Sequence, residues 1–178
     1  EIPLRLVGSE MCIRDSQQIV QRVCANLQAV AQSHQVMLDL DTKGQPIMLL
    51  GDENALGQMV TNLIDNAIKY TPAMGHVHVV IKVDASTTLL SIKDDGIGID
   101  EANQERIFER FYRVDKARSQ SLGGTGLGLA IVKHIVQSHK GSLQLKSKLN
   151  QGSTFLIKIP LASDVNSVSY THLRAHET

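Results

Sequence analysis

The chain is organised around Asn62-Leu63-Ile64-Asp65-Asn66-Ala67-Ile68-Lys69-Tyr70-Thr71. Apolar residues in and before this stretch recur at three- and four-residue steps, which predicts a helix with one broad face buried in a core. A second stripe carries Asn62, Asn66 and Lys69, which project from one line of the same helix. Asparagine prefers caps and turns to helix interiors, so two asparagines one turn apart indicate a functional surface.

Length and charge are those of an ordinary globular domain. The 178 residues are 42% hydrophobic, which suits one domain with a sizeable core. Basic and acidic residues each number 18, so the net charge is zero and no general attraction to nucleic acid or an anionic membrane is expected. Cys12 and Cys24 are too few for a disulfide framework, and no apolar run approaches the roughly 20 residues of a membrane helix. A cytoplasmic setting is therefore expected.

The two ends of the chain differ in character from the rest. Residues 9–16 and 167–178 resemble translated sequencing-adapter read-through. We therefore expect 1–16 to be a non-native leader, 17–161 to be the domain, and 162–178 to be a linker end with a non-native tail. Disordered native tails are the alternative.

Hydrophobic periodicity predicts the order helix, strand pair, helix, hairpin, loop, helix, strand pair. Helices are expected over 17–33 with Ser16 as a cap, from Asp52 to Thr71, briefly from Glu101, and from 128 to about His139. Strands are expected over 36–40, 46–50, 76–83, 87–92, 142–148 and 153–159, and a mobile loop over 114–122. Because the strands pair locally, the predicted fold is a two-layer α+β sandwich, with helices on one face of a mixed sheet.

Two further stretches carry residues suited to a binding site. Lys93-Asp94-Asp95-Gly96-Ile97-Gly98-Ile99-Asp100 places carboxylates and glycines directly after a predicted strand. Gly123-Gly124-Thr125-Gly126-Leu127-Gly128 opens a predicted helix, where bare N–H groups and the helix dipole favour a phosphate. The dinucleotide fingerprint fails because it needs glycine or alanine where Leu129 stands, and no glycine-lysine-serine/threonine completes a P-loop.

These stretches occur in the order of the N, G1, F and G2 boxes of bacterial sensor histidine kinases. The matching segments are Asn62–Thr71, Asp94–Ile99, Ile107–Arg113 and Gly123–Ala130, followed by Gly152-Ser153-Thr154-Phe155. The chain thus resembles the catalytic ATP-binding domain of such a kinase, in the wider group that includes gyrase, the Hsp90 chaperones and MutL. The likeness covers 17–161 and implies a Bergerat-type fold that binds ATP and Mg²⁺.

The resemblance implies a role for residues at both ends of a nucleotide. Asn66 matches the asparagine that holds Mg²⁺ on the ATP phosphates, Asn62 would assist it, and Lys69 can reach a phosphate oxygen. Asp94 matches the carboxylate that accepts a hydrogen bond from the adenine amino group and that guanine would leave unpaired. The other implied contacts are Tyr70 at the nucleoside, Gly96 and Gly98 at the base, Thr154 in support of Asp94, Gly124, Thr125, Gly126, Leu127 and Gly128 at the triphosphate, and Arg113 and Arg118 as charge stabilisers.

Several of these assignments have structural alternatives. Lys69 can simply form an ion pair with Asp65 one turn earlier. Tyr70 can be a core residue, and the two arginines can be solvated loop charges. Phe108 and Phe111 are expected to pack and anchor the loop that covers the site, without contacting the ligand.

One absence favours phosphotransfer over hydrolysis. ATP-hydrolysing relatives carry a glutamate where this chain has Asn62, and an amide cannot take a proton from water. A neutral imidazole needs no such base, so the resemblance implies transfer of the γ-phosphoryl group to a histidine, with Asn62, Asn66, Lys69 and Arg113 taking part. The expected partners are a separate dimerisation domain that carries this histidine and a response regulator receiver domain, and the isolated domain is expected to be a monomer. The alternatives are an ATPase switch of the gyrase, Hsp90 or MutL type, a serine kinase of the anti-sigma type, and a non-catalytic nucleotide-binding module.

Overall fold

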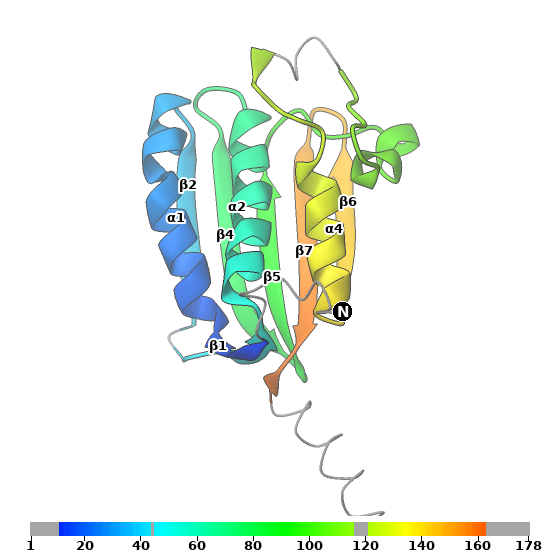
Figure 1. The fold of residues 1–178 in the computed structure, drawn as a ribbon. Helices are drawn as coiled ribbons and strands as arrows, with labels where there is room; N and C mark the ends of the chain where they lie inside the picture. Colours follow the sequence, from blue (N-terminus) through cyan, green and yellow to red (C-terminus); the bar gives the residue numbers. More distant parts are fainter. Residues whose placement is uncertain (1–10, 44, 116–120, 163–178) are drawn as a thin grey trace, which may run out of the picture.

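A computed structural model describes residues 11–43, 45–115 and 121–162 as a mixed sheet with helices on one face (Figure 1). The strands of the sheet, in spatial order, are β2 (Met37–Thr42), β4 (His76–Asp84), β5 (Thr87–Asp94), β7 (Gly152–Pro160) and β6 (Ser142–Lys148). The helices on its covered face are α1 (Ser16–Ser33), α2 (Glu53–Lys69) and α4 (Gly128–Ser138). The predicted two-layer α+β sandwich is confirmed. None of the helices in this described part combines the length and apolar composition that a membrane span requires.

Two of the three predicted strand pairs are confirmed. β4 pairs with β5 and β6 with β7, both antiparallel, and β5 also pairs antiparallel with β7. This register puts Asp94, the last residue of β5, opposite Ser153 near the start of β7. Residues from two distant parts of the sequence therefore meet at one end of the sheet.

The third predicted pair, between 36–40 and 46–50, is wrong. β2 pairs with β4 in parallel, and β3 (Met48–Gly51) pairs with β1 (Cys12–Asp15) in a separate two-stranded sheet. The parallel register sets buried Leu38 beside buried Val77, which a hairpin with β3 would not do. Burial of apolar area in the main core therefore decides the pairing over the short connection.

Residues expected to precede the domain take part in its fold. The N-cap of α1 is Asp15, whose Oδ1 accepts from the N–H of Gln17 at 3.0 Å and of Ile47 at 3.2 Å. Ser16, the predicted cap, is the first helical residue, and its hydroxyl donates to the Ile47 carbonyl at 2.9 Å. The adapter-like origin of residues 9–16 stays a prediction.

Helix α2 forms the centre of the core, as its periodicity predicts. Asp52 caps it by accepting from the N–H groups of Asn54 at 2.9 Å and Ala55 at 3.2 Å. Leu63, Ile64 and Ile68 are 0% exposed, and each such side chain stabilises the fold by about 1.5–3 kcal/mol. This packing fixes the helix and therefore the polar stripe beside its buried face.

Buried His139 ties the end of α4 to the start of α2. Its Nε2 accepts from the Asp52 N–H at 3.1 Å, so its Nδ1, 2.7 Å from the Ile135 carbonyl, carries the proton. Helix α2 carries the polar stripe, and helix α4 follows the glycine run. His139 thus joins the two helices at the end of the molecule remote from the stripe and the run (Figure 1).

Candidate functional site

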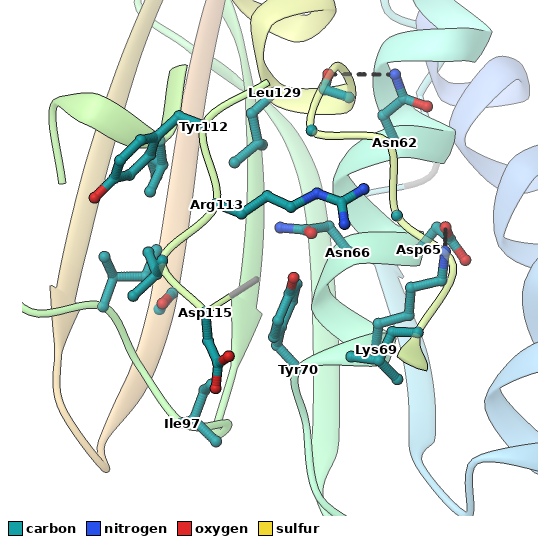
Figure 2. A pocket seen from close by; sticks show the side chains of 18 of the residues that line it. Asn62, Asp65, Asn66, Lys69, Tyr70, Ile97, Tyr112, Arg113, Asp115 and Leu129 are labelled. Atoms are coloured by element: carbon teal, nitrogen blue, oxygen red, sulfur yellow. Dashed lines mark hydrogen bonds and ion pairs between the residues drawn. The ribbon is translucent and has the colours of Figure 1, made fainter. Parts of the chain in front are cut away.

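A cavity of about 430 Å³ lies between α2, the loop after β5, residues 107–115 and the glycine run 123–128 (Figure 2). It brings together most of the residues expected from the sequence. The predicted residues that line it are Asn62, Asn66, Lys69, Tyr70, Asp94, Gly98, Arg113, Gly124, Thr125, Gly126 and Gly128. Arg118 and most of the predicted loop over 114–122 lie outside the described residues.

The polar stripe of α2 forms one wall of the cavity. The Asn62 amide donates from Nδ2 to the Gly128 carbonyl at 3.3 Å, which leaves its Oδ1 as an acceptor. The Lys69 ammonium lies 2.9 Å from the Asp65 carboxylate, with both side chains about one third exposed or less. The ion-pair alternative for Lys69 is thus present in the structure. Asp65, expected only as the partner of Lys69, also lines the cavity.

Asp94 is a buried carboxylate on the cavity wall and is only 7% exposed. Its Oδ1 accepts from the backbone N–H of Gly96 at 2.9 Å and of Ser153 at 3.3 Å. Burial raises the pKa of this carboxyl, an effect that the two N–H groups partly offset and the nearby charge of Asp95 reinforces. Both hydrogen bonds use Oδ1, so within the described residues Oδ2 is left as an acceptor for a ligand.

Two glycines allow the loop after β5 to pack closely. A Cβ on Gly98, whose φ is +69°, would lie 2.0 Å from the Lys148 carbonyl oxygen. A Cβ on Gly96 would lie 2.4 Å from the carbonyl oxygen of Tyr70. Gly96 is not among the lining residues, so the backbone approach that it permits is to the end of α2 rather than to the base expected from the sequence.

The glycine run and the start of α4 form the opposite end of the cavity. Gly126, with φ +75°, accepts from the Phe111 N–H at 2.9 Å. Leu127 is the N-cap of α4 but makes no side-chain cap bond, and it does not line the cavity as predicted. The first N–H groups of this helix therefore remain suited to an anion.

The two phenylalanines of the aromatic segment Ile107–Arg113 behave differently. Phe108 packs edge-on against Phe155, with ring centroids 6.3 Å apart, as predicted. Phe111 is 70% exposed, so its predicted packing is wrong. Its backbone, at φ +65°, is bound to Gly126, and it is this main-chain contact that joins the segment to the glycine run.

Tyr112 is a lining residue that the sequence analysis did not assign. Its hydroxyl donates to the Asn103 Oδ1, and the Arg106 guanidinium lies 4.4 Å from its ring centroid. Asn103 is itself held by Asp100 at the start of the helical turn η1 (Glu101–Asn103). The neighbouring Arg113 extends its side chain toward the amides of α2 (Figure 2). The fixed tyrosine thus anchors the segment from which this cation enters the cavity.

The residue that supports Asp94 from β7 is Ser153 and not Thr154. Strand residues alternate between faces, and buried Phe155 and Ile157 place Ser153 on the inner face and Thr154 on the outer one. Ser153 lines the cavity, and its N–H bonds Asp94. Extending the apolar alternation back from Phe155 would have identified it in the sequence.

The side chains of the cavity suit a metal ion that is held mainly by the phosphates of a bound molecule. No three His, Cys, Asp or Glu side chains of the described residues are placed to hold a metal between them. Asn62 and Asn66 line the cavity and each carries an amide oxygen, and Mg²⁺ binds to one or two protein oxygens when phosphates and water complete its shell. The residues present therefore fit Mg²⁺ bound together with a phosphorylated ligand.

The family model described as "Histidine kinase-, DNA gyrase B-, and HSP90-like ATPase" matches residues 51–163. The chain is 41% identical over 155 residues to the sensor-like histidine kinase SenX3 of Mycolicibacterium smegmatis, covering 87% of this chain and 40% of SenX3. It spans less than half the length of the curated relatives that it matches.

Solved structures show the same relationship. The mycobacterial sensor histidine kinase MprB superposes with a TM-score of 0.73 at 29% identity, covering 85% of this chain and 98% of that one. Full-length ShkA in complex with AMPPNP gives 0.75 at 27% identity, covering 88% of this chain and 32% of ShkA. The chain therefore belongs to the family of histidine kinase-, DNA gyrase B- and HSP90-like ATPases, and its similarity within that family is to the catalytic domains of sensor histidine kinases.

Proposed function

We propose that the cavity binds ATP with Mg²⁺, with adenine at Asp94 and the triphosphate between α2 and the glycine run. The observation that carries this proposal is the meeting of a buried carboxylate, two helix amides and an uncapped helix start in one cavity. These groups come from three separate segments, and they suit different parts of a nucleotide. ShkA, a structural neighbour, is known in complex with AMPPNP, which supports the same ligand class here.

Recognition of the base would depend on the free oxygen of Asp94. A carboxylate Oδ2 accepts a hydrogen bond from the amino group of adenine, whereas guanine presents an oxygen at the corresponding place. Because Asp94 is buried, an oxygen facing it would leave both groups without a partner. Discrimination against guanine is therefore expected to be strong.

At the other end, the residues of α2 would meet the phosphates. Mg²⁺, when bound, supplies positive charge that neutralises the phosphate oxygens, and Asn66 would hold it through its amide oxygen with help from Asn62. Lys69 would divide its ammonium hydrogens between Asp65 and a phosphate oxygen, since an ammonium has three donors. Arg113 is directed into the same space and would stabilise charge on the transferred group (Figure 2).

The reaction that this site suits is transfer of the γ-phosphoryl group to a histidine on a separate dimerisation domain. Asn62 offers an amide where hydrolysing relatives carry a glutamate, and that amide is bonded to Gly128. Asp65 also lines the cavity, but it is paired with Lys69 and is therefore poorly placed to take a proton from water. A receiver domain of a response regulator would then accept the phosphoryl group, in a cytoplasmic two-component pathway.

Titration with Mg-ATP and Mg-GTP tests the binding proposal. Wild type is expected to prefer Mg-ATP, Asp94→Asn to lose about ten- to hundredfold of that preference, and Asn66→Ala to lose the dependence on magnesium. Unchanged binding in both variants would remove the site assignment.

Incubation with labelled ATP tests the reaction. An acid-labile phosphoprotein is expected only when an intact histidine-bearing domain is supplied. Steady release of phosphate by the domain alone would instead support an ATPase switch.

A further inference from the structure

Ser147, on the inner face of β6, lies behind the base end of the cavity and does not line it. Its hydroxyl oxygen accepts from the Ile99 N–H at 2.8 Å and donates to the Gly152 carbonyl at 3.1 Å. The hydroxyl of Ser153 lies 2.7 Å from the same oxygen. Ser147 therefore joins the loop after β5, the first residue of β7 and the residue that supports Asp94.

All three contacts of Ser147 are hydrogen bonds at the same time only when Ser153 donates to Ser147. A hydroxyl has one proton and two lone pairs. The proton of Ser147 goes to the Gly152 carbonyl, which can only accept, and one lone pair receives the Ile99 N–H. The remaining lone pair accepts the proton of Ser153. Ser153 then has only lone pairs left to offer on the wall of the cavity.

A second acceptor beside Asp94 changes what the base end can recognise. Oδ2 of Asp94 and Oγ of Ser153 are both acceptors, and the Ser153 N–H keeps the two residues together at 3.3 Å from Oδ1. An amino group has two hydrogens and suits a pair of acceptors, whereas the carbonyl of guanine would face both of them without a donor.

We propose that Ser147 is a specificity-determining positioning residue: by accepting the Ser153 proton, it holds the Ser153 hydroxyl as an acceptor and so strengthens the preference for adenine over guanine nucleotides. This inference rests on the proposed nucleotide site. Without Ser147, the Ser153 hydroxyl is free to rotate and donate to a guanine oxygen. Ser147 acts through Ser153 and touches no ligand itself.

The test is the ratio of the dissociation constants for Mg-GTP and Mg-ATP, measured by calorimetry on the same preparations. Ser147→Ala is expected to lower this ratio about three- to tenfold, the range that one hydrogen bond contributes. Ser153→Ala removes the acceptor itself and is expected to lower the ratio similarly. Because both variants break one arrangement, the double variant is expected to match Ser153→Ala alone.

Two control variants separate this role from general loosening. Ser142→Ala makes the same chemical change on an exposed position of β6 and should leave both dissociation constants unchanged. Gln104→Met removes the amide that donates to the carbonyls of Ile99 and Ser147, both at 3.0 Å, but leaves the serine hydroxyls in place. It is expected to weaken the binding of both nucleotides equally and to leave the ratio of the dissociation constants unchanged.

The outcomes keep the two proposals apart. A wild-type preference for Mg-ATP that persists unchanged in Ser147→Ala overturns the role of Ser147 and leaves the nucleotide site intact. An equal loss of the ratio in Gln104→Met also overturns it, because Ser147 would then act only through packing. Absence of Mg-ATP binding by wild type overturns the nucleotide site itself. If Ser147→Ala does not fold, an unchanged ratio in Ser153→Ala overturns the proposal, and a lowered ratio supports the Ser153 acceptor on which it rests.

Discussion

The two ends of the cavity are built in different ways. At the end proposed to hold the base, Asp94 is held by backbone N–H groups from its own loop and from β7, within a paired sheet. At the end proposed to hold the phosphates, the glycine run is joined to its surroundings by the Asn62 amide at Gly128 and by the Phe111 N–H at Gly126. The first end is made of strands, and the second is made of the backbone of the glycine run beside helix α2.

Gly152 and Gly123, both with positive φ and one at each end, differ in how closely they are packed. A Cβ on Gly152, at φ +86°, would lie 2.0 Å from the Asp94 carbonyl oxygen. A Cβ on Gly123, at φ +74°, would have no described atom within 4 Å. The backbone at Gly152 is therefore preformed at atomic contact, whereas Gly123 leaves room among the described residues for a ligand and for the backbone itself.

The largest effect is expected from Gly152→Ala. The new methyl group must move the backbone of Asp94 in addition to adopting a strained φ, so a loss of about 3 kcal/mol or more in the free energy of unfolding is expected. Gly123→Ala carries the strain alone and should cost about 1–2 kcal/mol. Urea unfolding of both variants measures the difference. Equal losses would mean that Gly152 and Gly123 are packed alike.

A second contrast lies within the aromatic segment. Phe108→Ala removes the ring that packs on Phe155 and is expected to cost about 2–3 kcal/mol, since Phe108 is only partly buried. Phe111→Ala removes an exposed ring and should change stability by less than about 0.5 kcal/mol. Thermal unfolding checks both values. A large loss in Phe111→Ala would show that its ring packs in solution.

Local patterns predicted most of this fold. The periodicity of α2, its Asp52 cap and the hairpin of β4 and β5 depend on residues close together in the chain, and the structure has all three. The parallel pairing of β2 with β4 was missed because its partners are far apart in sequence, and only the shared core decides their register.

The site was predictable where its residues break a local rule. Two asparagines inside a helix are unusual enough to identify the α2 wall, but Ser147 is an ordinary serine between lysines. Its three hydrogen bonds arise from the alignment of β6, β7 and the loop after β5, which no local pattern specifies. The residue that supports Asp94 from β7 was expected at Thr154, one position after Ser153, although the alternation of β7 contained the signal.

Asp94→Asn is expected to stabilise the nucleotide-free domain at neutral pH. Burial raises the pKa of Asp94, so the charged carboxylate is less stable in the folded state than in the unfolded state, and stability is lost as pH rises through that raised pKa. Asparagine keeps the Oδ1 acceptor for Gly96 and Ser153 but carries no charge. The Tm of the variant should therefore exceed that of wild type near pH 7, and the gap should close as pH falls below the usual carboxyl value. A lower Tm at all pH values would show that the charge does not cost stability.

Glu53→Gln is expected to have the smallest effect, with the opposite sign. The hydrogen bond from Arg22 at 2.9 Å, together with the charges of Arg14 and Arg22, lowers the pKa of Glu53 despite some desolvation. A lowered pKa contributes stability above the ordinary carboxyl value, and this stability is lost as pH falls through the lower folded value. The variant should therefore unfold slightly below wild type near pH 7, because an exposed pair contributes little, and the difference should vanish in acid. Measured beside Asp94→Asn over the same pH range, it distinguishes a carboxylate retained at a cost for a ligand from one that supports the fold. Shifts of the same sign in both variants would contradict that distinction.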